Sequence, residues 1–129
     1  MSDLDIECEI VAKGLTAPRV TPQDIEANIA QEFYFTAADA VRALGGLPRA
    51  QQHENLKNIE LLTFCVLVLK NGFTVTGESA CASPENFNAE LGRKIARENA
   101  INKVWPLMGY ELKCRLFAGK DGDRAPVVE

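Results

Sequence analysis

The chain has 129 residues, which is enough for one domain with a sizeable buried core. Apolar residues make up 47% and charged residues 25%, a globular composition that excludes a chain disordered throughout. The formal net charge of −4, from 18 acidic and 14 basic residues, argues against direct DNA binding, because phosphate contacts need a positive surface. We therefore expect a single domain over 1–129, with its compact part at about 15–117.

The chain lacks the signals of membrane insertion and secretion. Its longest apolar run, residues 61–69, is far shorter than the roughly 20 residues that cross a bilayer. The first residues, MSDLDIEC, are acidic, whereas a secretion signal begins with basic residues. These features predict a protein that stays in the cytoplasm in which it is made.

The cysteines and the single histidine do not form a metal-binding pattern. No two cysteines make a C-x-x-C pair, and one histidine cannot complete a usual zinc ligand spacing. We expect no metal, no cofactor and reduced structural thiols, with a reactive or bridged pair as the alternative. The residues concerned are Cys8, Cys65, Cys81, Cys114 and His53.

Short helices are expected in the N-terminal third. Each follows a hydroxyl residue that can cap a helix, and the second also has proline at its first position and an acid in its first turn. The expected helices are 3–13 after Ser2, one from Pro22 after Thr21, and 37–44 after Thr36. Ile25 and Ile29, spaced four apart, are expected on one face of the second helix. Residues 45–58 are polar and broken by glycine and proline, which predicts a loop.

A β-hairpin is expected next. In LLTFCVLVL at 61–69, both sets of alternating positions are apolar, which is the pattern of a strand buried on both sides. Asn71-Gly72 then separates it from FTVTGESA, and this dipeptide is a strong signal for a two-residue turn with positive φ at both positions. In the second strand Phe73, Val75 and Gly77 share one face.

A long helix and a third strand complete the expected fold. Ser83-Pro84-Glu85 predicts the start of a helix over about 84–105, which Pro106 would end. YELKCRLF at 110–117 alternates and predicts a strand, and 118–129 would be a flexible tail. The fold class is α+β: short N-terminal helices, then a three-stranded antiparallel sheet of order 2-1-3 with 61–69 at its centre and one long helix packed on it. The other face of the sheet must be covered by the N-terminal helices or by a second subunit, so a homo-oligomer is expected.

The long helix carries two apolar strips, which indicates contacts with two surfaces. One contains large residues, the other small ones. The large residues are Phe87, Leu91, Ile95, Ile101 and Trp105, and the small strip contains Ala89, Ala96, Ala100 and Val104.

Two places could bind a ligand. Lys94, Glu98 and Asn102 interrupt the large-residue strip at four-residue spacing; they form either a polar cluster facing a pocket or a rim in which Lys94 pairs with Glu98. The second place is the strand–helix junction at 76–86, where free backbone N–H groups favour an anion. Its candidate side chains are Thr76, Glu78, Ser79 and Ser83.

No catalytic constellation is recognisable. The only histidine lies in the expected loop, and neither a G-x-S-x-G motif nor a Cys–His motif is present. The sequence favours a non-catalytic protein. A small enzyme that uses carboxylates such as Glu78 and Glu98 on a nucleotide or similar anionic ligand remains the alternative.

Several stretches resemble a bacteriophage protein family named after N-four gene product 49 and Sf6 gene 66. The distinctive stretches are APRVTPQDIEANI, the NGFTVTGES hairpin, the PENF helix start and the KVWPLMGY helix end. The resemblance extends over about 15–116. It implies a phage or prophage accessory gene and brings no catalytic residues with it.

These observations lead to one functional expectation with two alternatives. We expect a phage accessory protein that acts by binding in the host cytoplasm, for host takeover or counter-defence. Its target would be a host protein or a small signalling nucleotide. The alternatives are the carboxylate enzyme and a structural protein associated with the virion or with packaging.

Overall fold

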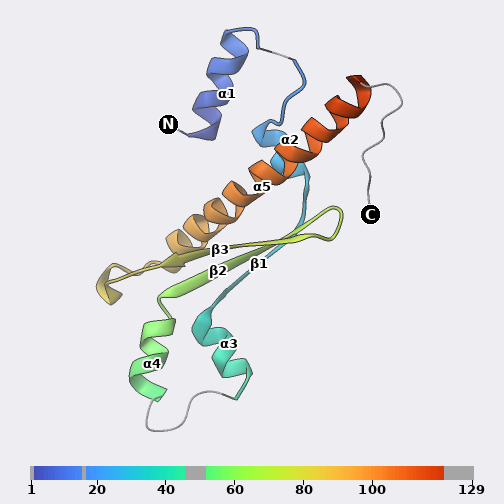
Figure 1. The fold of residues 1–129 in the computed structure, drawn as a ribbon. Helices are drawn as coiled ribbons and strands as arrows, with labels where there is room; N and C mark the ends of the chain where they lie inside the picture. Colours follow the sequence, from blue (N-terminus) through green and yellow to red (C-terminus); the bar gives the residue numbers. More distant parts are fainter. Residues whose placement is uncertain (1, 16, 46–51, 121–129) are drawn as a thin grey trace. The chain divides into compact units, whose positions relative to one another are not determined.

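Helices lie before, between and after the strands along the chain in a computed structural model that describes residues 2–15, 17–45 and 52–120 (Figure 1). They divide into two units, 1–28 with 104–129, and 29–103. The elements are α1 (Asp3–Ala12), α2 (Pro22–Ala27), β1 (Ile29–Thr36), α3 (Ala37–Ala43), α4 (Gln52–Ile59), β2 (Leu62–Leu69), β3 (Thr74–Ala80), the short 3₁₀ helix η2 (Pro84–Asn86) and α5 (Ala89–Lys120). The first part of α5 belongs to the second unit and the rest to the first.

The three expected N-terminal caps are confirmed. The hydroxyls of Ser2, Thr21 and Thr36 each accept a hydrogen bond of 3.1 Å from the backbone N–H of an aspartate three residues later. Each aspartate side chain in turn accepts from the backbone N–H of its cap residue, which completes a capping box. These reciprocal bonds explain why α1, α2 and α3 begin where the sequence predicts.

The second helix is shorter than expected. It ends at Ala27, and Ile29 already begins β1, so Ile25 and Ile29 do not share a helical face. The aromatic and β-branched residues of IAQEFYFT favour the extended chain. This strand is the one that the sequence interpretation missed.

The sheet has three antiparallel strands in the order β1-β2-β3. The central position of β2 is confirmed, but the expected order 2-1-3 is wrong. Residues 110–117, expected as the third strand, are helical, and β1 occupies the place beside β2. Since β1 and β3 are each antiparallel to β2, the strands are neighbours in the order in which the chain presents them.

The long helix starts later and ends later than expected. Residues 84–86 form only a single 3₁₀ turn, and α5 begins at Ala89, where the Asn88 side chain accepts from the Leu91 N–H at 2.9 Å. Pro106 lies inside α5 instead of ending it. A proline removes one helical hydrogen bond, to the carbonyl of Asn102. Because Asn102 and Pro106 are exposed, water can serve that carbonyl.

The expected loop and tail are only partly irregular. Within 45–58, Gln52–Ile59 belongs to α4, so the loop prediction is wrong for this part, while 46–51 lie outside the described residues. Residues 118–120 are the end of α5, and 121–129 also lie outside the described residues.

The turn between β2 and β3 uses one glycine. Gly72 has a φ of +89°, and its N–H donates to the Leu69 carbonyl at 2.9 Å. Asn71 keeps a negative φ, contrary to expectation, and its side chain accepts from the Phe73 N–H at 2.9 Å. Glycine is needed at 72 because residues with a Cβ rarely adopt this conformation.

The first part of α5 packs on one face of the sheet through its small-residue strip. Ala96 and Ala100 are fully buried, and so are Cys65 and Leu67 of β2. A Cβ added to Gly77 of β3 would lie 2.1 Å from the Ala96 carbonyl oxygen and 2.3 Å from the Ala100 nitrogen. The absence of a side chain at Gly77 therefore lets strand and helix backbones meet directly. In the large-residue strip, Leu91 and Ile95 are 54% and 40% exposed.

We predict that Gly77→Ala destabilises the protein, because the new methyl group would collide with backbone atoms that cannot rotate away. Overpacking of this kind costs about 1–3 kcal/mol, and a backbone obstacle places the cost near the upper end. Urea unfolding followed by circular dichroism measures the loss. Gly109→Ala is the matched control, because nothing lies within 4 Å of its added Cβ. In a helix that change stabilises by about 0.5–1 kcal/mol; equal effects at both positions would contradict the packing argument.

Candidate interaction surface

The face of the sheet that α5 does not cover carries an exposed apolar strip. Side chains alternate along each strand, and the paired positions of neighbouring strands share a face. Phe33 is paired with Val66, and Phe35 with Phe64, so these four lie together with Val68. We call this set the open face: Phe33, Phe35, Phe64, Val66 and Val68.

The aromatic residues of the open face pack on one another and still reach solvent. The rings of Phe35 and Phe64 are stacked with centroids 5.5 Å apart. Phe33 and Phe35 are 50% and 37% exposed. The whole face of the three strands, polar border included, spans roughly 14 by 26 Å, or about 370 Å². Exposed aromatic residues gathered on one side of a sheet make this face a candidate contact surface.

Two of the sequence-predicted site residues lie along this face. Thr76 is paired with Val66 and Glu78 with Phe64, so both side chains project on the same side of the sheet as the open face, and both are exposed. They give the strip a polar border on β3. Residues 76–78 are therefore candidates for binding because they border an apolar surface, and not because they lie near a helix start.

The rest of the 76–86 junction lacks the helix start on which the predicted anion site depended. Ser79 is half-buried on the side of the sheet that faces α5, while Ser83 precedes η2 and makes no side-chain cap bond. A single 3₁₀ turn presents no aligned row of N–H groups, and α5 begins only at Ala89 with Asn88 as its cap. The structure thus separates Ser83 from the helix start that the sequence predicts.

The second predicted cluster lies on the outer surface of α5. Lys94, Glu98 and Asn102 are all exposed. Lys94 Nζ lies 3.4 Å from Glu90 Oε1, so its ion pair is with the residue one turn earlier and not with the predicted Glu98. Neither described cavity is lined by these three residues.

A polar network beneath α5 was missed by the sequence interpretation. The Tyr34 hydroxyl donates to Glu32 Oε1 at 2.9 Å, and Arg97 Nε lies 3.2 Å from Glu32 Oε2. Burial, followed by the hydrogen bond to Glu32, raises the pKa of Tyr34. Burial also raises the pKa of the Cys65 thiol beside it, which keeps this cysteine protonated. In the sequence, only the alternation of residues along β1, which places Glu32 and Tyr34 on one face, could have indicated this network.

The described cavities are small, and the described residues hold no metal-binding group. One cavity of about 240 Å³ lies in the first unit, and one of about 90 Å³ lies in the second beside Tyr34 and Arg93. Ligand pockets commonly measure about 300–1,000 Å³. Within 2–15, 17–45 and 52–120, no three His, Cys, Asp or Glu side chains gather as metal ligands. No helix in these ranges is long and apolar enough to cross a bilayer.

These features define a small α+β protein whose single sheet is covered by a helix on one face and exposes an apolar strip on the other. Residues 20–116 match the model of the phage protein (N4 Gp49/phage Sf6 gene 66) family. The chain therefore belongs to this phage protein family, as its sequence motifs indicate. Neither the comparison with curated proteins nor the comparison with solved structures found a match.

We predict that alkaline pH weakens the fold through Tyr34. The pKa of Tyr34 in the folded state is raised above its unfolded value of about 10. The free energy of unfolding that Tyr34 contributes is therefore fully present below pH 10 and is lost as the pH rises beyond it. Urea unfolding between pH 9 and 11 should show a steeper loss for the wild type than for Tyr34→Phe. Tyr110→Phe, at a position that is 75% exposed, is the control and should follow the wild type. Equal slopes for all three proteins would contradict the assignment.

Proposed function

We propose that this chain is a phage accessory protein that acts by binding a host protein in the cytoplasm of the infected cell, without catalysis. The open face carries the proposal. It combines aromatic side chains with a border of Thr76 and Glu78, which is the composition of a protein contact surface: apolar in the middle and polar at the rim. Membership of a phage family supplies the biological setting.

The chemistry of the open face indicates the kind of partner. The strip itself is uncharged, so the matching surface must be apolar and free of buried charges. A cation opposite Glu78 would complement the one carboxylate of the border. The roughly 370 Å² of the face is about half of the 800 Å² that one partner gives to a standard interface. The partner therefore also contacts neighbouring residues, or it binds weakly.

A protein target fits better than a small signalling nucleotide. The described cavities are smaller than ordinary ligand pockets, and the 76–86 junction offers no helix start for a phosphate. The carboxylate enzyme is also less well supported. Glu78 borders a flat sheet face and Glu98 lies on the exposed side of α5, and neither lines a described cavity.

We predict that Phe33→Asp weakens partner capture by about 30-fold or more while the chain still folds. Phe33 is half-exposed on the edge strand β1, and a charge placed within the strip must be desolvated on binding. Loss of a central aromatic contact costs about 2 kcal/mol or more, or roughly 30-fold in affinity. The measurement is quantitative mass spectrometry of proteins captured by the tagged chain from infected cells.

The matched control is Phe73→Asp. Phe73 is 56% exposed but lies in the β2–β3 turn, outside the open face. A host protein lost with Phe33→Asp and kept with Phe73→Asp supports the proposal, and equal capture by both variants contradicts it. Native mass spectrometry of the same samples shows whether the chain forms the expected homo-oligomer. If Phe33→Asp only dissociates copies of the chain, the occupant of the open face is a second subunit.

The nucleotide alternative has its own measurement. We expect cyclic nucleotides and ADP-ribose derivatives to leave the melting temperature unchanged, because binding to the folded state alone would raise it. A concentration-dependent increase would favour a small ligand over a protein target. Mass spectrometry of that ligand after incubation would then show whether it is turned over.

A further inference from the structure

The N-terminal helix α1 is attached to its unit without burying any residue. Its capping box of Ser2 and Asp5 defines the helix locally. None of its ten residues is buried, and Leu4 and Val11 are 61% and 57% exposed. Hydrophobic burial, which usually fixes a helix in place, therefore contributes little to holding α1.

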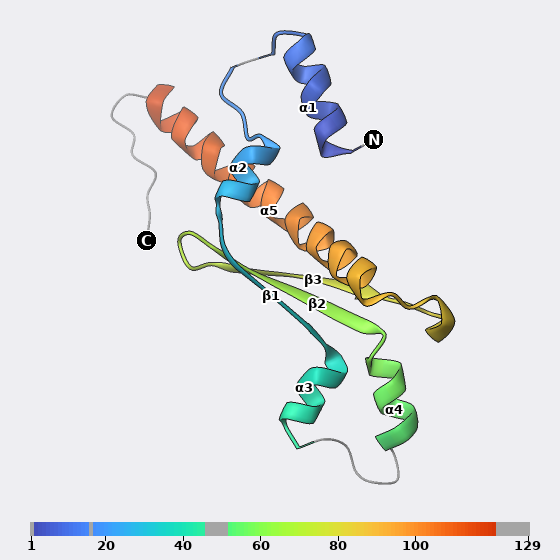
Figure 2. The same cartoon turned by 180° about the vertical axis from the view of Figure 1, so that it is seen from behind.

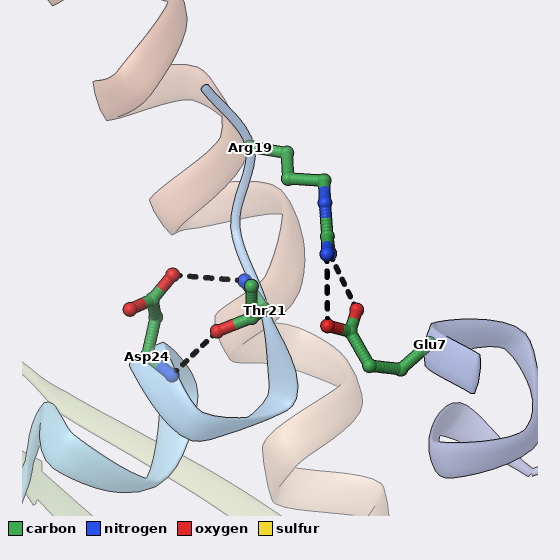
Figure 3. Close-up of polar contacts among 4 residues, drawn as sticks. All are labelled: Glu7, Arg19, Thr21 and Asp24. Carbon is green, nitrogen blue, oxygen red and sulfur yellow. Dashed lines mark hydrogen bonds and ion pairs between the residues drawn. The ribbon is translucent and has the colours of Figure 1, made fainter. Parts of the chain in front are cut away.

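Polar contacts hold α1 instead. Arg19 forms a two-pronged ion pair with Glu7, with Nη2 and Oε2 2.9 Å apart (Figure 3). Both side chains are largely shielded, with 24% and 16% of their surfaces exposed, and Arg19 lowers the pKa of Glu7. A forked arginine–carboxylate pair fixes orientation as well as position. At the start of the helix, the Trp105 indole N–H donates to Asp3 at 3.2 Å.

Beneath α1 lies an apolar groove that the helix covers without filling. Its floor is Val20, Pro22 and Trp105, and α1 contributes Ile6 and Ile10. About 240 Å³ remains between them, whereas a water molecule takes about 30 Å³ of liquid volume. Tight packing would leave no such space.

The side of α1 that faces the groove has a simple pattern. Asp3 and Glu7 are four residues apart, and so are Ile6 and Ile10, so each pair lies along one side of the helix. The carboxylates reach the indole N–H and the guanidinium, while the isoleucines line the groove. The groove thus matches a helix with paired acids beside paired apolar residues.

The family match separates α1 from the groove. The family model begins at residue 20, so it includes Val20, Pro22 and Trp105 but excludes α1 and Arg19. The matched region thus contains the floor of the groove but not α1, which covers it.

We propose that the groove of Val20, Pro22 and Trp105 is a docking surface for a helix with paired acids beside paired apolar residues, and that α1 occupies it as a releasable cover. Because the attachment depends on carboxylate contacts, its strength falls when either partner loses its charge. Release exposes the Trp105 side of the groove to another helix of the same pattern. This site is independent of the open face.

The single tryptophan of the chain reports the release directly. In the full-length protein, Glu7→Arg should shift the emission of Trp105 to longer wavelength and increase its quenching by acrylamide. The double variant Glu7→Arg with Arg19→Glu restores the ion pair in reverse and should restore the wild-type emission. Glu9→Arg makes the same charge change in α1, but Glu9 pairs with Lys13 at 3.0 Å, away from the groove, and should resemble the wild type.

Two further measurements complete the test. The thermal midpoint of Glu7→Arg should fall slightly, because the contacts of α1 stabilise only the folded state, while unfolding should still show one cooperative transition. A synthetic peptide of residues 2–13, added to full-length Glu7→Arg, should return the emission towards shorter wavelength, while a scrambled peptide should not. Unchanged emission in Glu7→Arg, failure of the double variant to restore it, loss of the cooperative unfolding transition, or no response to the peptide would each overturn the proposal.

Discussion

The unit 29–103 depends on the direct approach of two backbones. With no side chain at Gly77, the turn of α5 that contains Ala96 and Ala100 lies on β3 with nothing between them. This contact uses the small-residue strip of the helix, so the larger Leu91 and Ile95 are left partly exposed. The helix therefore covers one face of the sheet closely, and the aromatic residues of the other face remain open. Figure 2 shows α3 and α4 together at one end of the sheet.

Local signals in the sequence predicted most of the element starts. The capping residues Ser2, Thr21 and Thr36 act over three positions, so their effect can be read without knowing the rest of the fold. The doubly apolar β2 was correctly placed at the sheet centre, but the expected burial of both its sides is wrong, because only the side facing α5 is buried and the other belongs to the open face. The capping signals depend on near neighbours in the sequence alone.

The errors arose where tertiary structure overrides a local rule. Pro106 is a helix terminator by local reasoning, yet α5 continues through it because only one exposed carbonyl loses its partner. The alternation of 110–117 then suggested a strand where the helix continues, and the four-residue spacing of Ile25 and Ile29 suggested a helix where β1 begins. Ser83-Pro84 resembles a helix start but begins only a single 3₁₀ turn. The row of helical N–H groups on which the predicted anion site depended is therefore absent there. Thr76 and Glu78 were chosen for the junction, but their position depends on strand register, which the sequence does not state.

The two proposed surfaces differ in what maintains them. The open face exists because the helix packs on the opposite side of the sheet, so a change that disrupts Gly77 would disturb it as well. The groove of the first unit depends on Arg19, Glu7 and Asp3, which lie outside the sheet. One surface is thus linked to the stability of its unit, while the other responds to charge.

The order β1-β2-β3 also has a consequence for the folding pathway. Each strand pairs with the next strand along the chain, but the two connections differ in length: residues 37–61, with α3 and α4, join β1 to β2, whereas a short turn joins β2 to β3. The β2–β3 turn closes a loop of a few residues, and loop-closure entropy rises with length, so this hairpin is the least costly part to form first. Since Gly77 lies in this hairpin, the bare stretch of strand on which α5 packs is formed by the most local pairing of the sheet.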